Sequence, residues 1–308
     1  MAPGGATDQL AERAAVLALV DVTKAGWHRT ASVIEEAGSA LRLLRHDYSG
    51  LEVDEQPLAR ELVGRVKPDA VQRFMDVIER LEAEEIQVLT VLDEGYPTNL
   101  RDVFNRPPML FVKGRLLDSD ERAVAVVGTR TASPKGLAEA RRLASELARR
   151  GVTVLSGLAK GIDTAAHEGA LESGGRTIAV MGTGIRRVYP AENAALSKRI
   201  LEHGALVSQF WPDAPPTQSS FPIRNVTMSG MGIGTAVIEA SATSGAKMQA
   251  RLALEHGKRL FLVESLVMSQ AWAKRYATRP GAIVVRSADE ILPLVDRLTK
   301  PARELTLF

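Results

Sequence analysis

The chain has 308 residues, of which 39 are lysine or arginine and 37 are aspartate or glutamate, so its formal net charge is only +2. This balance excludes a bulk cationic character, and any affinity for an anionic polymer must come from a local patch. The sequence contains no cysteine, which excludes disulfides, zinc–thiolate sites and thiol catalysis, and no two of its five histidines have zinc-ligand spacing. We expect neither a metal nor a cofactor.

The N-terminal segment, MAPGGATDQLAERAA, has neither the basic start nor the apolar core of a signal peptide. No apolar stretch of the sequence is long enough to span a bilayer. Together with the lack of cysteine, these features predict a cytoplasmic protein without membrane contact. We expect residues 1–8 to be disordered.

A helical pattern extends from Leu10 to about Leu81. Apolar residues repeat at helical spacing near both ends of this stretch, at Leu10, Ala14, Leu17 and Val20 and again at Phe74, Val77, Ile78 and Leu81. The pattern predicts four or five short helices, which form a small N-terminal domain over residues 1–84.

The pattern changes at Ile86–Thr90, which is strand-like, as is Met109–Val112. From Val124 on, apolar strands alternate with helices, and the candidate strands are 124–127, 152–155, 176–181, 205–208, 235–239, 259–263 and 282–285. Near-continuous apolar strands in such alternation indicate a mostly parallel sheet covered by helices on both faces. The sequence therefore predicts an α/β fold, with a Rossmann-like doubly wound sheet over residues 85–300 and a short tail over 301–308.

Five turns with small or basic residues follow the predicted strands. They are Gly128-Thr129-Arg130 with Ser133, Ser156-Gly157 with Lys160-Gly161, Gly182-Thr183-Gly184 with Arg186 and Arg187, Phe221–Asn225, and Ser244–Lys247. Ligands of doubly wound sheets bind beyond the carboxyl ends of the strands. A single glycine there is often only a tight turn, but backbone N–H groups combined with arginine and lysine suit phosphates. The five turns together predict an edge that holds either a nucleotide or a nucleic-acid backbone.

Three ionisable residues near this edge have two interpretations each. Asp163 is expected to cap the helix that it begins, and His167, one turn later, could pack against it. The alternative is a general acid–base pair, although neither a nucleophile nor a metal ligand stands near them in the sequence. Glu239 follows an apolar strand and could either bind a ribose hydroxyl or cap a helix. No Walker A motif and no complete dinucleotide fingerprint is present.

Six motifs carry a resemblance to a known family. They are Val127-Gly128-Thr129-Arg130 with Ser133 and Gly136, Ser156–Leu171, Gly174–Val180, Tyr189-Pro190 with Asn193, Phe221-Pro222 with Arg224-Asn225, and Val237–Ala240 with Ser244-Gly245. In this combination, over residues 86–260, the chain resembles the DNA-processing protein A (DprA/Smf) family. Its helical N-terminal part resembles the helix-hairpin-helix or SAM-like front domain of that family.

The resemblance implies a DNA-binding protein rather than an enzyme, without catalytic residues. Its members bind single-stranded DNA in a basic pocket, form homodimers through the Rossmann-like domain and help to load the RecA recombinase during natural transformation. The DNA- or phosphate-binding residues expected here are Gly128, Arg130, Ser133, Ser156, Gly157, Lys160, Gly161, Gly182, Gly184, Arg186, Arg224, Asn225, Ser244, Gly245 and Lys247. Because aromatic residues make up only 5% of the chain, phosphate contacts should predominate over base stacking.

The chain departs from the family pattern at several positions. Val226 replaces an arginine, Ala246–Gln249 replace small and hydroxyl residues, and Glu264-Ser265 replace a proline-glycine pair. The segment up to Thr278 also differs, and the C-terminal winged-helix-like domain of many members is expected to be missing. These departures suggest a short, divergent paralogue. Two alternatives remain: a nucleotide-binding enzyme or sensor that resembles the phosphoribohydrolases through Gly232–Thr235 and Glu239, or an interaction protein that kept the fold and lost the ligand.

Overall fold

The computed structural model describes residues 5–24 and 26–299, and their contacts separate into two compact units. The first unit reaches to Tyr96 and also contains Phe104–Lys113. The second consists of Pro97–Val103 and the described residues from Gly114 onward. The expected tail over 301–308 lies outside the described residues, as do residues 1–4 of the segment expected to be disordered.

The first unit contains five helices and an antiparallel strand pair. The elements are α1 (Gly5–Asp21), α2 (Trp27–Ala37), α3 (Ala40–Leu44), α4 (Gln56–Val63), α5 (Ala70–Ala83), β1 (Ile86–Thr90) and β2 (Met109–Gly114). The number of helices confirms the sequence-based expectation. However, α1 already begins at Gly5, so the expected disorder of residues 5–8 is wrong. The helix is stable because its side chains from Ala14 to Val20 are all buried, which makes it the centre of the helical core.

The second unit is built on seven parallel strands. They are β3 (Ala123–Val127), β4 (Thr153–Ser156), β5 (Thr177–Val180), β6 (Ala205–Ser208), β7 (Gly234–Val237), β8 (Arg259–Val263) and β9 (Ala282–Val285). Their order in the sheet is β6-β5-β4-β3-β7-β8-β9, and each neighbouring pair is parallel. All residues of β3 are buried, as an apolar run in the centre of a two-sided sheet requires. The predicted doubly wound α/β fold is confirmed.

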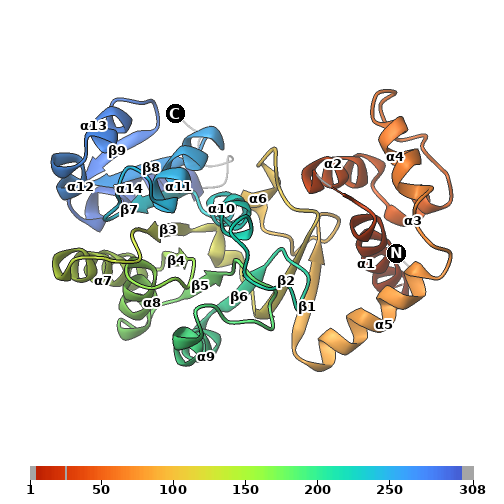
Figure 1. Cartoon of the computed structure of the whole chain (residues 1–308), viewed down its shortest axis with the longest axis horizontal. Helices are drawn as coiled ribbons and strands as arrows, with labels where there is room; N and C mark the ends of the chain where they lie inside the picture. The colour runs from red at the N-terminus through yellow and green to blue at the C-terminus, as the bar shows by residue number, and fades with distance from the viewer. Residues whose placement is uncertain (1–4, 25, 300–308) are drawn as a thin grey trace, which may run out of the picture. The chain divides into compact units, whose positions relative to one another are not determined.

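The helices of the second unit lie on both faces of this sheet. They are α6 (Thr98–Arg101), α7 (Pro134–Arg149), α8 (Ile162–Glu172), α9 (Ala194–His203), α10 (Ser220–Met231), α11 (Gly245–Glu255), α12 (Glu264–Ser269), α13 (Ala271–Ala277) and α14 (Leu292–Thr299). Figure 1 shows α7, α8 and α9 on one face and α10 and α11 on the other. Serine side chains cap two of them, because Ser133 accepts from the Gly136 N–H and Ser244 from the Lys247 N–H.

The strand order places a topological switch point between β3 and β7. From β3 the chain proceeds through β4 and β5 to β6 at one side, and it then returns to the other side of β3 for β7, β8 and β9. Connections that leave β3 and β7 in opposite directions open a crevice at the carboxyl ends of these two strands, where doubly wound proteins bind their ligands.

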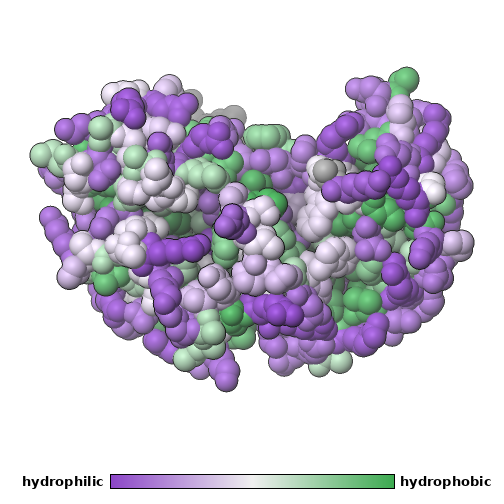
Figure 2. Space-filling model, in the orientation of Figure 1, coloured by the Kyte–Doolittle hydropathy of each residue, from purple (hydrophilic) through white to green (hydrophobic). Residues whose placement is uncertain are grey.

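The face of the molecule seen in Figure 2 is predominantly polar. Figure 2 shows hydrophilic residues over most of the face in view, with hydrophobic residues interspersed among them. Within the described residues, no helix combines the length and the apolar character that a membrane span needs.

The packing of α7 against α8 depends on a close backbone approach at Gly169. A Cβ atom on Gly169 would overlap the backbone carbonyl of Arg141 in α7. We therefore expect Gly169→Ala to lower the free energy of unfolding by about 1–3 kcal/mol, the usual cost of overpacking. Urea denaturation of both proteins measures the change. Gly245→Ala is the matched control, since a Cβ there meets no atom within 4 Å. Equal stability of the two variants would contradict this account of the helix pair.

Candidate functional site

Two adjoining cavities lie at the switch point. The first, which we call the hydroxyl pocket, has a volume of about 550 Å³ and is lined by Thr129, Thr131, Ser133, Lys135, Gly136, Glu139, Ile238–Ser241, Ser265, Leu266, Ser269 and Gln270. The second, the arginine groove, has a volume of about 330 Å³ and is lined by Val127–Arg130, Ala159, Asp163, Phe221, Pro222, Arg224, Asn225, Met228, Ser241, Ser244–Ala246, Met248 and Gln249. Thr129 and Ser241 line both, so the two cavities are neighbours at the ends of β3 and β7.

Arg224 of α10 is the central cation of the arginine groove, and it is only 6% exposed. Its guanidinium donates to the carbonyl of Gly157 (2.8 Å), to that of Val180 (2.5 Å) and to the Asn225 side chain (3.1 Å). A Cβ at Gly157 would overlap this guanidinium, so the loop after β4 needs glycine there. The contacts tie α10 to the ends of β4 and β5.

Asp163 supplies a buried negative charge near this cation. The residue stands inside α8, whose N-cap is Gly161, so the expectation that Asp163 caps the helix is wrong. Its carboxylate instead accepts from the backbone N–H groups of Gly157 (3.0 Å) and Ala159 (3.4 Å), because the side chain folds back over the preceding loop. Burial raises the pKa of Asp163, and the charge of Arg224 opposes that rise. Burial likewise lowers the pKa of Arg224, against the attraction of Asp163.

His167 is fully buried and bonds to Thr177 rather than to Asp163. Thr177 Oγ1 donates to the Val154 carbonyl, so His167 Nδ1 donates to Thr177 Oγ1 over 2.7 Å. The other ring nitrogen, Nε2, has no hydrogen-bond partner within the described residues. Burial, with a smaller effect from Arg224, lowers the pKa of His167 to about 3. The ring is therefore neutral at physiological pH, and its contacts are those of a structural residue.

Arg130 lies exposed at the rim of the groove beside the Phe221 ring, which in turn contacts Tyr189. Its Cζ atom is 5.0 Å from the centroid of the Phe221 ring, and the Tyr189 ring is 5.7 Å from the Phe221 ring. Tyr189 is 44% exposed. Phe221 was expected in a turn but lies in α10, and stacking was expected to be minor because aromatic residues make up only 5% of the chain. The two rings are 32 positions apart in the sequence and meet only in the fold. Tyr-Pro and Phe-Pro pairs were the signal that could have found them.

The structure places the sequence-predicted site residues in three groups. The arginine groove brings together Gly128, Arg130, Arg224, Asn225, Ser244 and Gly245, and Ser133 lines the hydroxyl pocket. The other candidates lie outside both linings: Ser156, Gly157, Lys160, Gly161, Gly182, Gly184, Arg186 and Lys247.

Several of these outer candidates have partners within the protein. Lys160 pairs with Glu192 (2.5 Å) and Arg186 with Asp213 (2.7 Å). The buried Ser156 hydroxyl donates to the Val126 carbonyl (2.7 Å). Within the described residues, no group of three side chains is arranged to hold a metal ion.

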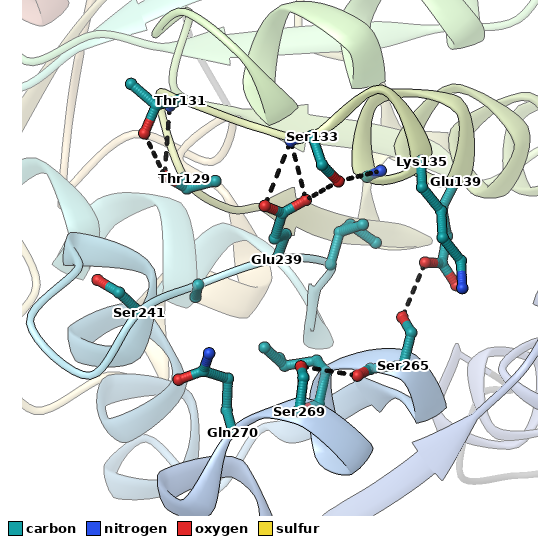
Figure 3. A pocket seen from close by; sticks show the side chains of 14 residues that line it. Thr129, Thr131, Ser133, Lys135, Glu139, Glu239, Ser241, Ser265, Ser269 and Gln270 are labelled. Atoms are coloured by element: carbon teal, nitrogen blue, oxygen red, sulfur yellow. Dashed lines mark hydrogen bonds between the residues drawn. The ribbon is translucent and has the colours of Figure 1, made fainter.

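Glu239 of the hydroxyl pocket has one of the two roles that the sequence left open, that of a helix cap. Its carboxylate accepts from the Ser133 backbone N–H (3.1 Å) and from the Ser133 hydroxyl (2.7 Å), so it sits at the N-terminus of α7 as a helix-capping group (Figure 3). A Cβ on Gly136 would overlap the same carboxylate, so a larger residue there would displace Glu239 from Ser133. The positive end of α7 is thus already occupied by an anionic group of the protein.

The chain is a doubly wound α/β protein with two cavities at its switch point. The model of the family described as DNA recombination-mediator protein A matches residues 87–296. Protein Smf of Escherichia coli (strain K12) is 39% identical over 69% of this chain and 57% of its own length. DNA processing protein DprA of Streptococcus pneumoniae (strain ATCC BAA-255 / R6) is 34% identical over 68% of this chain and 75% of its own length. The chain thus spans little more than half of the E. coli relative.

Solved structures of DprA proteins are also similar to this chain. The X-ray structure of DprA from S. pneumoniae has a TM-score of 0.69 and 27% identity, with 91% of this chain and 97% of that chain covered. DprA from Helicobacter pylori, whose structure reports a single-stranded DNA binding mode, has a TM-score of 0.59 and 26% identity over 70% of this chain and 95% of that one. The chain belongs to the DNA recombination-mediator protein A (DprA/Smf) family.

The low pKa of His167 predicts a pH-dependent stability. Below pH 6.5 the unfolded chain binds a proton at this residue, whereas the folded protein stays neutral there down to about pH 3. The stability contributed by the neutral ring is therefore lost as the pH falls through this window. Relative to His167→Gln, the wild type should lose about 2 kcal/mol of unfolding free energy between pH 6.5 and 5. Urea denaturation at both pH values tests this, and parallel losses in the two proteins would contradict it.

Proposed function

We propose that this protein is a DNA-binding recombination mediator that holds single-stranded DNA in the arginine groove. The observation that carries the proposal is the combination of Arg130, Phe221 and Tyr189 at the rim of a groove whose floor is the buried Arg224. Cations beside exposed rings are the pairing that single strands require, because the backbone is anionic and the bases are unstacked. Family membership and the DNA-binding relative from H. pylori support the same assignment.

The phosphates are assigned to the exposed cation and to backbone groups of the groove. Arg130 has a guanidinium that can bind a phosphate with two parallel hydrogen bonds. The first turn of α11, from Gly245, lines the same groove and directs the positive end of a helix toward it. Arg224 adds a positive charge from below, and its Nε and Nη1 atoms already donate to protein atoms. Its role is to set the potential and the shape of the groove.

The bases are assigned to the aromatic pair. Tyr189 is exposed enough to receive a base on its open face, and the adjoining Phe221 ring is itself held against Arg130. Stacking accepts any base, so the proposed binding is tolerant of sequence. In this assignment stacking contributes more than the low aromatic content of the chain suggested.

The finer assignments follow the family. We assign RecA loading, homodimer formation and a cytoplasmic role to this chain as parts of the same proposal, and we assign it no catalysis. The groove offers cations, backbone groups and rings for binding. The buried state of Asp163 and His167 argues against their use in proton transfer.

Titration of a fluorescent single-stranded oligonucleotide, followed by anisotropy at several salt concentrations, tests the phosphate assignment. Arg130→Ala should weaken binding about tenfold and reduce the slope of log K against log salt by about 0.7, the value for one lost phosphate contact. Arg150→Ala is the matched control, because this exposed arginine follows the opposite end of α7. A wild-type protein that does not bind, or two arginine variants with equal affinity, would overturn the assignment.

The stacking assignment makes a different prediction for the aromatic pair. Tyr189→Ala should weaken binding of the oligonucleotide by about 1–3 kcal/mol and leave the salt slope unchanged, because a lost stacking contact releases no counterions. The same titration with Tyr48→Ala, a tyrosine of the first unit, serves as the control. A change in slope at position 189, or unaltered affinity, would count against base stacking there.

A further inference from the structure

The hydroxyl pocket is the larger of the two cavities, and the proposed DNA-binding function does not use it. At about 550 Å³ it has the size of a small-molecule site, whereas the arginine groove is about 330 Å³. It lies at the switch point between β3 and β7, where the crevice of a doubly wound sheet takes its ligand. A ligand other than the proposed DNA strand would therefore fit this cavity.

Two serine–carboxylate contacts hold the cavity open. Ser133 donates to Glu239 and ties α7 to the segment after β7, and Ser265 of α12 donates to Glu139 of α7 (2.9 Å). These contacts link the three surrounding elements by short polar bonds (Figure 3). The walls are therefore preorganised, which lowers the cost of binding a small ligand.

The lining is polar but not cationic. Among the described lining residues, Lys135 is the one cation, against the carboxylates of Glu139 and Glu239. Six hydroxyl side chains surround the cavity: Thr129, Thr131, Ser133, Ser241, Ser265 and Ser269. Two carboxylates and the occupied end of α7 repel a chain of closely spaced phosphates, while hydroxyls and carboxylate oxygens suit a neutral, hydroxyl-rich group. A polynucleotide backbone does not fit this chemistry, but a sugar does.

Gln270 adds a group that can recognise a planar heterocycle. Its side-chain amide lines the cavity and has no hydrogen-bond partner within the described residues. Figure 3 shows it across the cavity from Ser133 and Thr131. Although Gln270 is the N-cap of α13, its side chain makes no capping bond. The amide thus offers two donors and one acceptor, the pattern that reads the edge of a base.

One wall of the cavity comes from a single stretch of the chain. Ser265, Leu266, Ser269 and Gln270 all belong to the stretch Glu264–Gln270 and line the cavity. Three of these side chains carry hydrogen-bonding groups, and none of the four lines the arginine groove. This wall therefore supplies polar groups to a ligand separate from the proposed DNA strand.

From these observations we infer that the hydroxyl pocket binds a ribonucleoside 5′-phosphate. The ribose lies among the hydroxyls and Glu239, the edge of the base meets the Gln270 amide, and the single phosphate reaches Lys135. Because Thr129 and Ser241 line both cavities, the bound nucleotide adjoins the strand in the arginine groove.

Isothermal titration calorimetry with the four ribonucleoside 5′-monophosphates and their 2′-deoxy counterparts tests the inference. At least one ribonucleotide should bind, and its deoxy counterpart should bind about fivefold more weakly, the effect of one lost neutral hydrogen bond. Gln270→Ala should weaken the ribonucleotide by a similar factor. Lys135→Ala should weaken the nucleotide but not the corresponding nucleoside. Gln218→Ala, which removes an exposed amide outside both cavities, is the matched control.

Several outcomes would overturn the inference. They are the absence of binding of all four ribonucleotides at millimolar concentration, equal affinity for ribose and deoxyribose forms, and binding that Gln270→Ala leaves intact but Arg130→Ala abolishes. The last result would place the nucleotide in the arginine groove. Titration of the same samples with single-stranded oligonucleotide keeps the two proposals separate. Gln270→Ala should retain wild-type DNA affinity, and loss of nucleotide binding alone leaves the DNA-binding function standing.

Discussion

The buried guanidinium of Arg224 is the interaction on which the geometry of the strand edge depends. A cation with so little access to water is tolerated only when its N–H groups are bonded and its charge is compensated. Gly157 and Val180 supply the carbonyls, and Asp163 supplies the nearby negative charge. The same arrangement fixes the loop after β4, the start of α8 and the first turn of α10. Phe221 stands one turn before Arg224 on α10. The buried cluster therefore fixes the position of the Phe221 ring beside Arg130.

The edge is divided into two cavities of opposite charge. The arginine groove is lined by two cations and one carboxylate, whereas the hydroxyl pocket is lined by two carboxylates and one cation. They lie on either side of the segments that leave β3 and β7, and Glu239 closes the N-terminus of α7 on one side of this division. Since a polynucleotide backbone cannot use a helix end that a carboxylate already occupies, the proposed DNA strand has its phosphates at Arg130 and α11. The overall charge of +2 conceals this local separation.

The sequence predicted the sheet well because its strands are short, buried apolar runs bounded by small residues, a pattern with few alternatives. It also located the loops at the switch point. What it missed depends on side-chain direction and on contacts between distant positions. Asp163 looked like a helix cap, but α8 begins one residue earlier, and the carboxylate turns back to the loop. The pairing of Arg186 with Asp213 and the meeting of Tyr189 with Phe221 join segments about 30 positions apart, which no local pattern encodes.

The segment Glu264–Thr278 is held to the rest of the second unit by two polar contacts. Trp272 is buried, and its indole N–H donates to the carbonyl of Ala240 (3.1 Å), directly after Glu239. With the Ser265–Glu139 contact, this bond fixes both ends of the stretch that faces the hydroxyl pocket. Gln270 lies between these two contacts, so its position is fixed. Its side-chain amide makes no hydrogen bond within the described residues. The Arg224 cluster is formed by other segments. Substitutions within Glu264–Thr278 can therefore change the wall of one cavity and leave intact the buried interaction that shapes the other.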